Sequence, residues 1–227
     1  MQEMLEEVFS RSKLLILDFN EIPKDTPKTE DISQYFESCK QARIDPKLPE
    51  HRQLFNDTLL NTSGVRYLVS RYGEERVAML AESQIAREGR TLHLGVDIFC
   101  RDLENVLAPC DGDIVRIGNE PENHSFGHYV FFRPKNKSLP AILLGHLGDG
   151  LQKLGSVIAG DVIAKLGDYI NHENGGWSRH LHVQMFRDIP SESDPLTGYS
   201  TREDFTANSS AYPDPLVYFP VWKIQGL

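Results

Sequence analysis

The segment RHLHVQMF, residues 179–186, alternates polar and apolar side chains and therefore predicts a β-strand. On a strand, residues two apart point to the same side and lie about 6–7 Å apart along the chain. His180 and His182 are thus expected side by side on one face, with Gln184 following them. By itself the pattern fits a metal site, an acid/base pair or a plain polar strand face, so the rest of the chain has to decide.

Similar short runs of β-branched and aromatic residues fill the chain from Ser63 onward, separated by Gly, Pro and Asp. Residues 65–80 predict two strands joined around 72–75. Strands at this rhythm are typical of an antiparallel sandwich or barrel-like core. We expect a mainly β protein, α+β overall. The runs are APCDGDIVRIG (108–118), HYVFFRP (128–134), AILLGHL (141–147), GSVIAGDVIAKLGD (155–168) and HLHVQMF (180–186).

Residues 1–62 differ from the remainder of the chain. Apolar residues at helical spacing predict helices near residues 1–9 and 31–39, and a weaker one over 49–60. The stretch LLILDF, residues 14–19, predicts a short strand. We therefore expect two parts, an N-terminal helical extension over 1–62 and a β domain over 63–227.

The composition limits the classes of partner. A formal net charge of −9 without any Lys/Arg cluster argues against nucleic acid or an anionic membrane surface as a partner. The acidic N-terminal stretch is unlike a secretory signal, and no segment is apolar enough to span a bilayer. Three scattered cysteines predict reduced thiols. These features favour a cytoplasmic protein.

The stretch HLGVD holds a second candidate pair, His93 and Asp97. On a straight strand the two would share a face but lie about 13 Å apart, which is too far for one metal ion. A bend between them would bring them together, and Gly95 is the residue that permits one. Together with His182 they would supply two imidazoles and one carboxylate, which leaves the fourth tetrahedral position for water, as in catalytic zinc sites.

Two further histidines belong to the same hypothesis. His180 would lie a few ångströms from the metal without binding it, although the spacing also allows both His180 and His182 as ligands. His146 ends the apolar run AILLGHL beside glycines, where its ring can face a cleft. Alone, such a residue is more often a half-buried histidine bound to backbone.

The order of these motifs resembles that of the lysostaphin-type (LytM-like) zinc metallopeptidases, whose best-known members cut peptidoglycan cross-bridges. The motifs HLGVDIF, APCDGDIVRIG, GHYVFF, GHL, GSVIAGDVIAKLGD and HLHVQ come in that family's order over roughly residues 65–190. The resemblance implies the family's antiparallel sheet, a duplicated hybrid motif, in the β domain. It also implies one zinc ion held by His93, Asp97 and His182, with His146 and His180 as catalytic residues that do not bind the metal.

The implied activity is hydrolysis of a peptide or amide bond. Zinc would polarise the scissile carbonyl and lower the pKa of its bound water, while His146 and His180 divide proton transfer and oxyanion stabilisation between them. Leu144 stands where secreted members commonly have an aromatic residue. The segments SRYGEERV and NHENGGWSRHLHVQ are similar to an intracellular branch fused to aminotransferase-like domains. Peptidoglycan-type peptides and small intracellular peptides are therefore both expected substrates, and other protein domains are expected partners.

Two alternatives from other classes stay open. One is a catalytically inactive zinc-binding module that mediates partner binding. The other is a carrier domain of the biotinyl, lipoyl or glucose-type phosphocarrier kind, which the two Gly-Asp turns resemble; the biotinyl and lipoyl domains need an exposed lysine beside Met, and no Met-Lys pair occurs here. The sequence predicts no oligomeric state.

Overall fold

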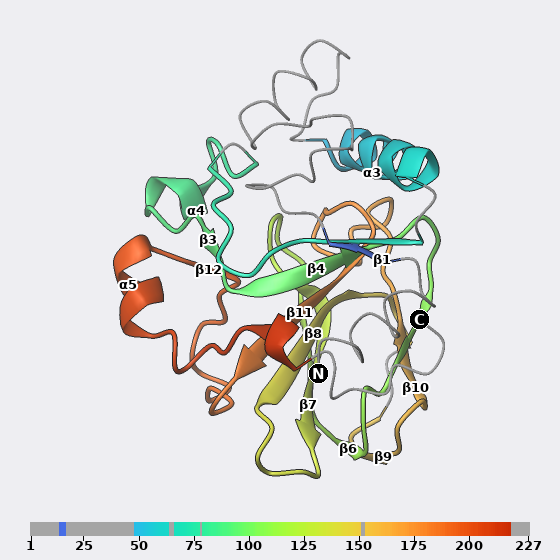
Figure 1. Cartoon of the computed structure of the whole chain (residues 1–227), viewed down its shortest axis with the longest axis vertical. Helices are drawn as coiled ribbons and strands as arrows, with labels where there is room; N and C mark the ends of the chain where they lie inside the picture. Colours follow the sequence, from blue (N-terminus) through green and yellow to red (C-terminus); the bar gives the residue numbers. More distant parts are fainter. Residues whose placement is uncertain (1–13, 17–47, 64–65, 78, 151–152, 219–227) are drawn as a thin grey trace.

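The computed structural model describes residues 14–16, 48–63, 66–77, 79–150 and 153–218 (Figure 1). The helices predicted near residues 1–9 and 31–39 lie outside these ranges. None of the helices in the described part is long and apolar enough to cross a membrane. The helices are α3 (Pro49–Ser63), α4 (Gln84–Arg87), α5 (Arg202–Ala207) and the 3₁₀ turn η1 (Pro215–Val217).

An eight-stranded sheet forms the centre of the molecule, in the order β1-β2-β4-β11-β8-β7-β6-β9 (Figure 1). Its strands are antiparallel except for the parallel pair β1–β2, which confirms the prediction of a mainly β, antiparallel core. Two small sheets, β10–β5 and β12–β3, flank it. The strands of the main sheet are β1 (Leu14–Ile16), β2 (Tyr67–Val69), β4 (Gly95–Phe99), β11 (His180–Phe186), β8 (Ala141–Leu147), β7 (Gly127–Pro134), β6 (Gly112–Glu120) and β9 (Gly155–Val157); those of the small sheets are β3 (Leu92–His93), β5 (Asn105–Leu107), β10 (Val162–Lys165) and β12 (Tyr199–Ser200).

Both faces of the main sheet are buried, and the strands divide their side chains between two cores. In β7, Val130 and Phe132 join the core that also contains residues of β5 and β10, whereas the alternate residue Phe131 joins a second core on the opposite face. In β11, Val183 belongs to the first core and Phe186 to the second. The even-numbered residues of β11, among them the two histidines, therefore face the second side of the sheet.

Only the first of the two strands predicted in residues 65–80 forms, so the second prediction was wrong. After β2 the chain makes an isolated bridge at Glu75 and then turns, with the Leu80 N–H donating to the Arg76 carbonyl. The apolar residues at the end of this stretch serve a local cluster instead, in which Leu80 packs with Trp177 and Tyr199.

The N-terminal part of the chain contributes two described elements. Helix α3 covers the region where a helix over 49–60 was expected and extends to Ser63. Strand β1 lies within the predicted stretch 14–19 and pairs with β2 at the edge of the main sheet. A strand from the first 62 residues thus extends the sheet of the β domain, and the boundary at residues 62 and 63 stays a prediction.

The apolar interior gives a direct stability prediction. Phe132 is fully buried in the first core, so Phe132→Ala is expected to lower the free energy of unfolding by about 3–5 kcal/mol, measured by chemical denaturation. Leu154 is 62% exposed, and Leu154→Ala is expected to change the same quantity by less than about 0.5 kcal/mol. Equal losses in the two variants would contradict this account of the core.

Candidate metal centre

The register of β4 and β11 places His182 directly opposite Asp97. Residues paired in this way have β-carbons about 4.5–5.5 Å apart. On its other side His182 pairs with Gly145 of β8, so no large side chain from that strand competes for the space. Two antiparallel pairings thus bring a histidine and an aspartate, 85 positions apart, onto one face of the sheet.

His93 reaches the same place because the chain changes sheets after β3. Strand β3 pairs with β12, Leu94 donates its N–H to the Gly198 carbonyl, and β4 then enters the main sheet. As a result His93 Nε2 lies 3.5 Å from Asp97 Oδ1, so the predicted bend is confirmed.

The need for glycine at position 95 has a different cause from the one expected. Gly95 is not among the residues with a positive φ. A β-carbon there would lie 2.6 Å from His182 Cε1 and 2.7 Å from the Val183 carbonyl oxygen, which is closer than real β-carbons approach. Gly95 is required because the His182 ring and the next strand occupy the space of a side chain.

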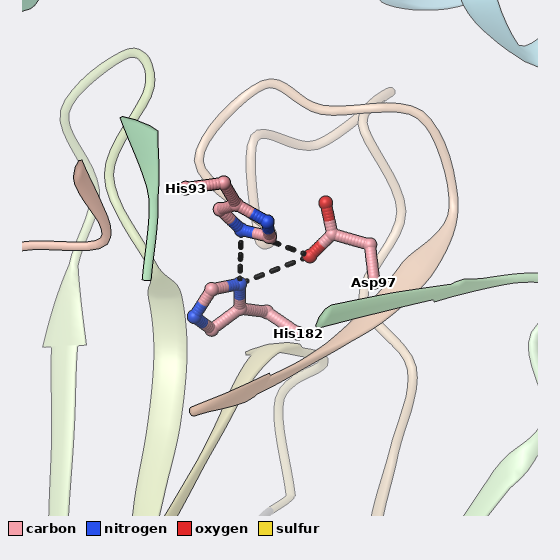
Figure 2. A group of neighbouring side chains, drawn as sticks. All are labelled: His93, Asp97 and His182. Carbon is pink, nitrogen blue, oxygen red and sulfur yellow. Dashed lines mark hydrogen bonds and ion pairs between the residues drawn. The ribbon is translucent and has the colours of Figure 1, made fainter. Parts of the chain in front are cut away.

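Figure 2 shows the three side chains converging, with one donor atom each at the centre. His93 Nε2 lies 3.1 Å from His182 Nδ1, which lies 2.9 Å from Asp97 Oδ1. With the 3.5 Å separation above, these distances bracket the edge of a tetrahedron whose metal–ligand bonds are about 2.0–2.1 Å, which is about 3.3 Å. All three residues are buried. The group can hold a metal ion.

Gln184 determines which nitrogen of His182 carries the proton. Its Nε2 donates to the Thr197 carbonyl at 3.1 Å, so its Oε1 is the atom that faces His182 Nε2, also at 3.1 Å. An amide oxygen only accepts, so Nε2 of His182 carries a proton, and in the neutral ring Nδ1 carries the lone pair. That lone pair lies 2.9 Å from the Asp97 carboxylate. Two acceptors at this distance repel each other unless a cation lies between them.

A buried cation supports the carboxylate on its other side. Arg76 Nη1 lies 2.7 Å from Asp97 Oδ2, and its guanidinium also pairs with buried Glu74. Burial opposes ionisation of Asp97, but His93 and Arg76 outweigh it and hold the pKa of this carboxyl well below its usual range. Arg76 and Glu74 are not among the predicted site residues, because charged residues in a stretch predicted as two joined strands give no sign of burial.

His146 and His180 stand beside the three donors, with ring centroids 4.4 Å apart. Each ring is oriented by a backbone carbonyl. Nδ1–H of His146 donates to Asn174 at 2.8 Å, and that of His180 donates to Ser178 at 2.7 Å. The lone pair of each ring is thus on Nε2, and that of His180 lies 3.5 Å from Asp97 Oδ1. Burial lowers the pKa of His180 to about 4 and that of His146 well below its usual value, so both rings are neutral.

An irregularity in β8 turns His146 toward this cluster. The β7–β8 pairing passes from His128↔Leu147 to Val130↔Leu144, which gives β8 one extra residue. His146 has a φ of +60°, in the left-handed region. Leu144 and Leu147 both join the first core, so regular alternation cannot describe this stretch. The bulge is what aims His146 at the other face.

The four histidines and the one aspartate predicted as site residues are therefore neighbours, and each is at most 5% exposed. The set of mutually close donor atoms in the described part of the chain contains His93, Asp97 and His182, and His180 is not part of it.

A cavity of about 180 Å³ opens on this cluster, and a second one of about 510 Å³ shares Glu120 and Leu196 with it. The two cavities therefore adjoin at these residues. His124 lines the first cavity. Its other walls include Ile85, Arg90, Phe126, Trp177, Thr197 and Tyr199.

Comparison with known proteins gave three kinds of result. Residues 91–195 match the model of peptidase family M23. A search of curated proteins found no match. Among solved structures, the catalytic domain of the antimicrobial peptidase lysostaphin from Staphylococcus simulans is 24% identical with a TM-score of 0.42, and the alignment covers 57% of this chain and 80% of that one. LytU is 24% identical with a TM-score of 0.36, over 54% of this chain and 81% of that one.

A zinc-containing peptidase from Vibrio cholerae is also 24% identical, with a TM-score of 0.36, over 47% of this chain and 32% of that one. The family match covers the whole stretch from β3 to the end of β11 and includes every residue of the donor cluster. This similarity to peptidase family M23 over residues 91–195 supports the lysostaphin-type, LytM-like family expected from the sequence.

Proposed function

We propose that the protein is a zinc metallopeptidase in which His93, Asp97 and His182 hold one zinc ion. The proposal rests on the geometry of three ligand atoms, here called the donor triangle: His93 Nε2, Asp97 Oδ1 and His182 Nδ1. In the neutral form of His182, the Nδ1 lone pair faces the Asp97 carboxylate oxygen at 2.9 Å. Two imidazoles and one carboxylate leave a fourth position open, as in catalytic rather than structural zinc sites. The family match supports the same assignment.

When bound, zinc polarises the scissile carbonyl and lowers the pKa of its water. The protein's part is proton transfer by His146 and His180. Both present an unprotonated Nε2, because their Nδ1–H groups are held by carbonyls of Asn174 and Ser178. One ring accepts the proton of the attacking water at Nε2. A ring protonated at that atom can then donate to the oxyanion or to the leaving amine.

The substrate in this proposal is a peptide or an amide. The cavity at the cluster is about 180 Å³ and adjoins a second cavity at Glu120 and Leu196, which leaves room for a short peptide beside the ligand residues. Glycine-rich peptidoglycan-type peptides and small intracellular peptides both meet this requirement. A panel of glycine-rich, D-amino-acid and ordinary dipeptide to pentapeptide substrates separates the two classes.

Metal content tests the ligand set. The purified protein is expected to contain about one zinc per chain, and His93→Ala and His182→Ala are each expected to lose it, as measured by atomic emission. His124→Ala is the matched control, since His124 lines the same cavity outside the donor set, and it should keep the metal. A wild-type protein that takes up no zinc on reconstitution would refute the proposal.

The role of Gln184 gives a separate prediction. Gln184→Met removes the acceptor that keeps the proton on His182 Nε2 and is expected to weaken zinc binding about 10–100-fold in a chelator competition assay. The control Gln84→Met makes the same replacement at an exposed position on α4 and should leave the affinity unchanged. Unchanged affinity in Gln184→Met would show that this hydrogen bond does not orient the ligand.

Hydrolysis tests the two remaining histidines. His146→Ala and His180→Ala are each expected to retain zinc and to lose about 100-fold or more in kcat, because proton transfer by a positioned group contributes about 10²–10⁴-fold. Activity is followed by release of new amines from the peptide panel. A zinc-loaded wild-type protein that hydrolyses none of the panel would favour an inactive partner-binding module instead.

A further inference from the structure

We infer that helix α3 is a positioning element of the active centre, which holds the segment 176–179 in the place that orients His180. This inference rests on the proposed function for its catalytic consequence, but its structural basis is independent of it. The polar residues Arg52, Gln53 and Asn56 of α3 are all buried, although they belong to a part of the chain outside the M23 match.

Gln53 ties together the ends of the two strands that carry the centre. Its Oε1 accepts the N–H of Arg179 at 2.7 Å, immediately before β11. Its Nε2 donates to the carbonyl of Cys100 at 3.3 Å, immediately after β4. The regular pairing of the two strands ends at His180↔Phe99. Beyond this pair, the Cys100 N–H donates to the Arg179 carbonyl at 3.5 Å, and the Gln53 side chain adds a second bridge between the same two residues.

Arg52 and Asn56 hold the residues on either side of Trp177. Arg52 Nη2 donates to the Gly176 carbonyl at 2.9 Å, and its guanidinium lies 4.9 Å from the centroid of the Trp177 ring. Asn56 Nδ2 donates to Ser178 Oγ at 3.3 Å. One face of the helix therefore contacts four consecutive residues, from Gly176 to Arg179.

That segment supplies two parts of the centre. The Ser178 carbonyl accepts Nδ1–H of His180 and so fixes the tautomer of that ring. The Trp177 ring lies against both His180 and His146, with centroid separations of 6.2 and 6.1 Å. Neither contact comes from α3 directly, so α3 acts through the segment rather than on the substrate. Loss of the α3 contacts should free the Ser178 carbonyl to move, whereas the indole keeps its own hydrogen bond from Nε1–H to the Ser125 carbonyl at 3.1 Å.

The experiment compares Gln53→Met with Leu54→Met in the full chain. Met keeps the helix propensity and approximate length of Gln but makes neither hydrogen bond, and Leu54 is the neighbouring residue of α3, 57% exposed. In protein with ¹⁵N-labelled histidine, Gln53→Met is expected to speed exchange of the His180 Nδ1–H with water about tenfold. A tenfold change corresponds to the contribution of about one hydrogen bond to stability. Zinc content should stay at the wild-type value.

In the hydrolysis assay, kcat of Gln53→Met is expected to fall about 10-fold or more while KM changes less than about twofold. Leu54→Met should match the wild type in all three measurements. Wild-type exchange at His180 in folded Gln53→Met overturns the inference whether or not the protein hydrolyses peptides, and a wild type that is inactive refutes the proposed function alone. If Gln53→Met does not fold, Asn56→Ala is judged by the same exchange measurement.

Discussion

The antiparallel register between β4 and β11 is the constraint on which the centre depends. Because His182 pairs with Asp97, the residues two further along, Gln184 and Gly95, are paired as well. This one register thus provides the carboxylate, the imidazole and the amide that sets the imidazole's tautomer. It also places Gly95, which has no side chain, where the imidazole ring needs space. A slip of one residue would turn every one of these side chains to the other core.

The same arrangement creates an electrostatic problem that the protein solves with neighbouring charges. Asp97 is a fully buried carboxylate, and burial of an unpaired charge is costly. Arg76 neutralises it on the Oδ2 side, while Oδ1 faces three histidine rings. When His182 is neutral, its Nδ1 carries the lone pair and cannot donate to Oδ1. A divalent cation bound as proposed would satisfy Oδ1 of Asp97 and the facing nitrogens of His93 and His182 together.

Periodicity was enough to predict the strands and the shared face of His180 and His182, and Gly95 indicated where a bend could bring His93 and Asp97 together. Periodicity could not predict the parts that depend on broken periodicity or distant packing. His146 reaches the centre through a bulge at a left-handed residue, and alternation along β8 gives no sign of it. Arg76 lies in a stretch predicted as a strand. The polar residues of α3 are buried against a segment 122–126 positions away, with which they form hydrogen bonds.

The central claim is that His182, and not His180, completes the ligand set. A crystal structure of the zinc-loaded protein with data collected at the zinc absorption edge tests it most directly. The account predicts one anomalous peak about 2.0–2.2 Å from His93 Nε2, Asp97 Oδ1 and His182 Nδ1, with His180 Nε2 beyond bonding distance. A peak bound through His180 Nε2 in place of His182 Nδ1, or located away from these residues, would contradict it.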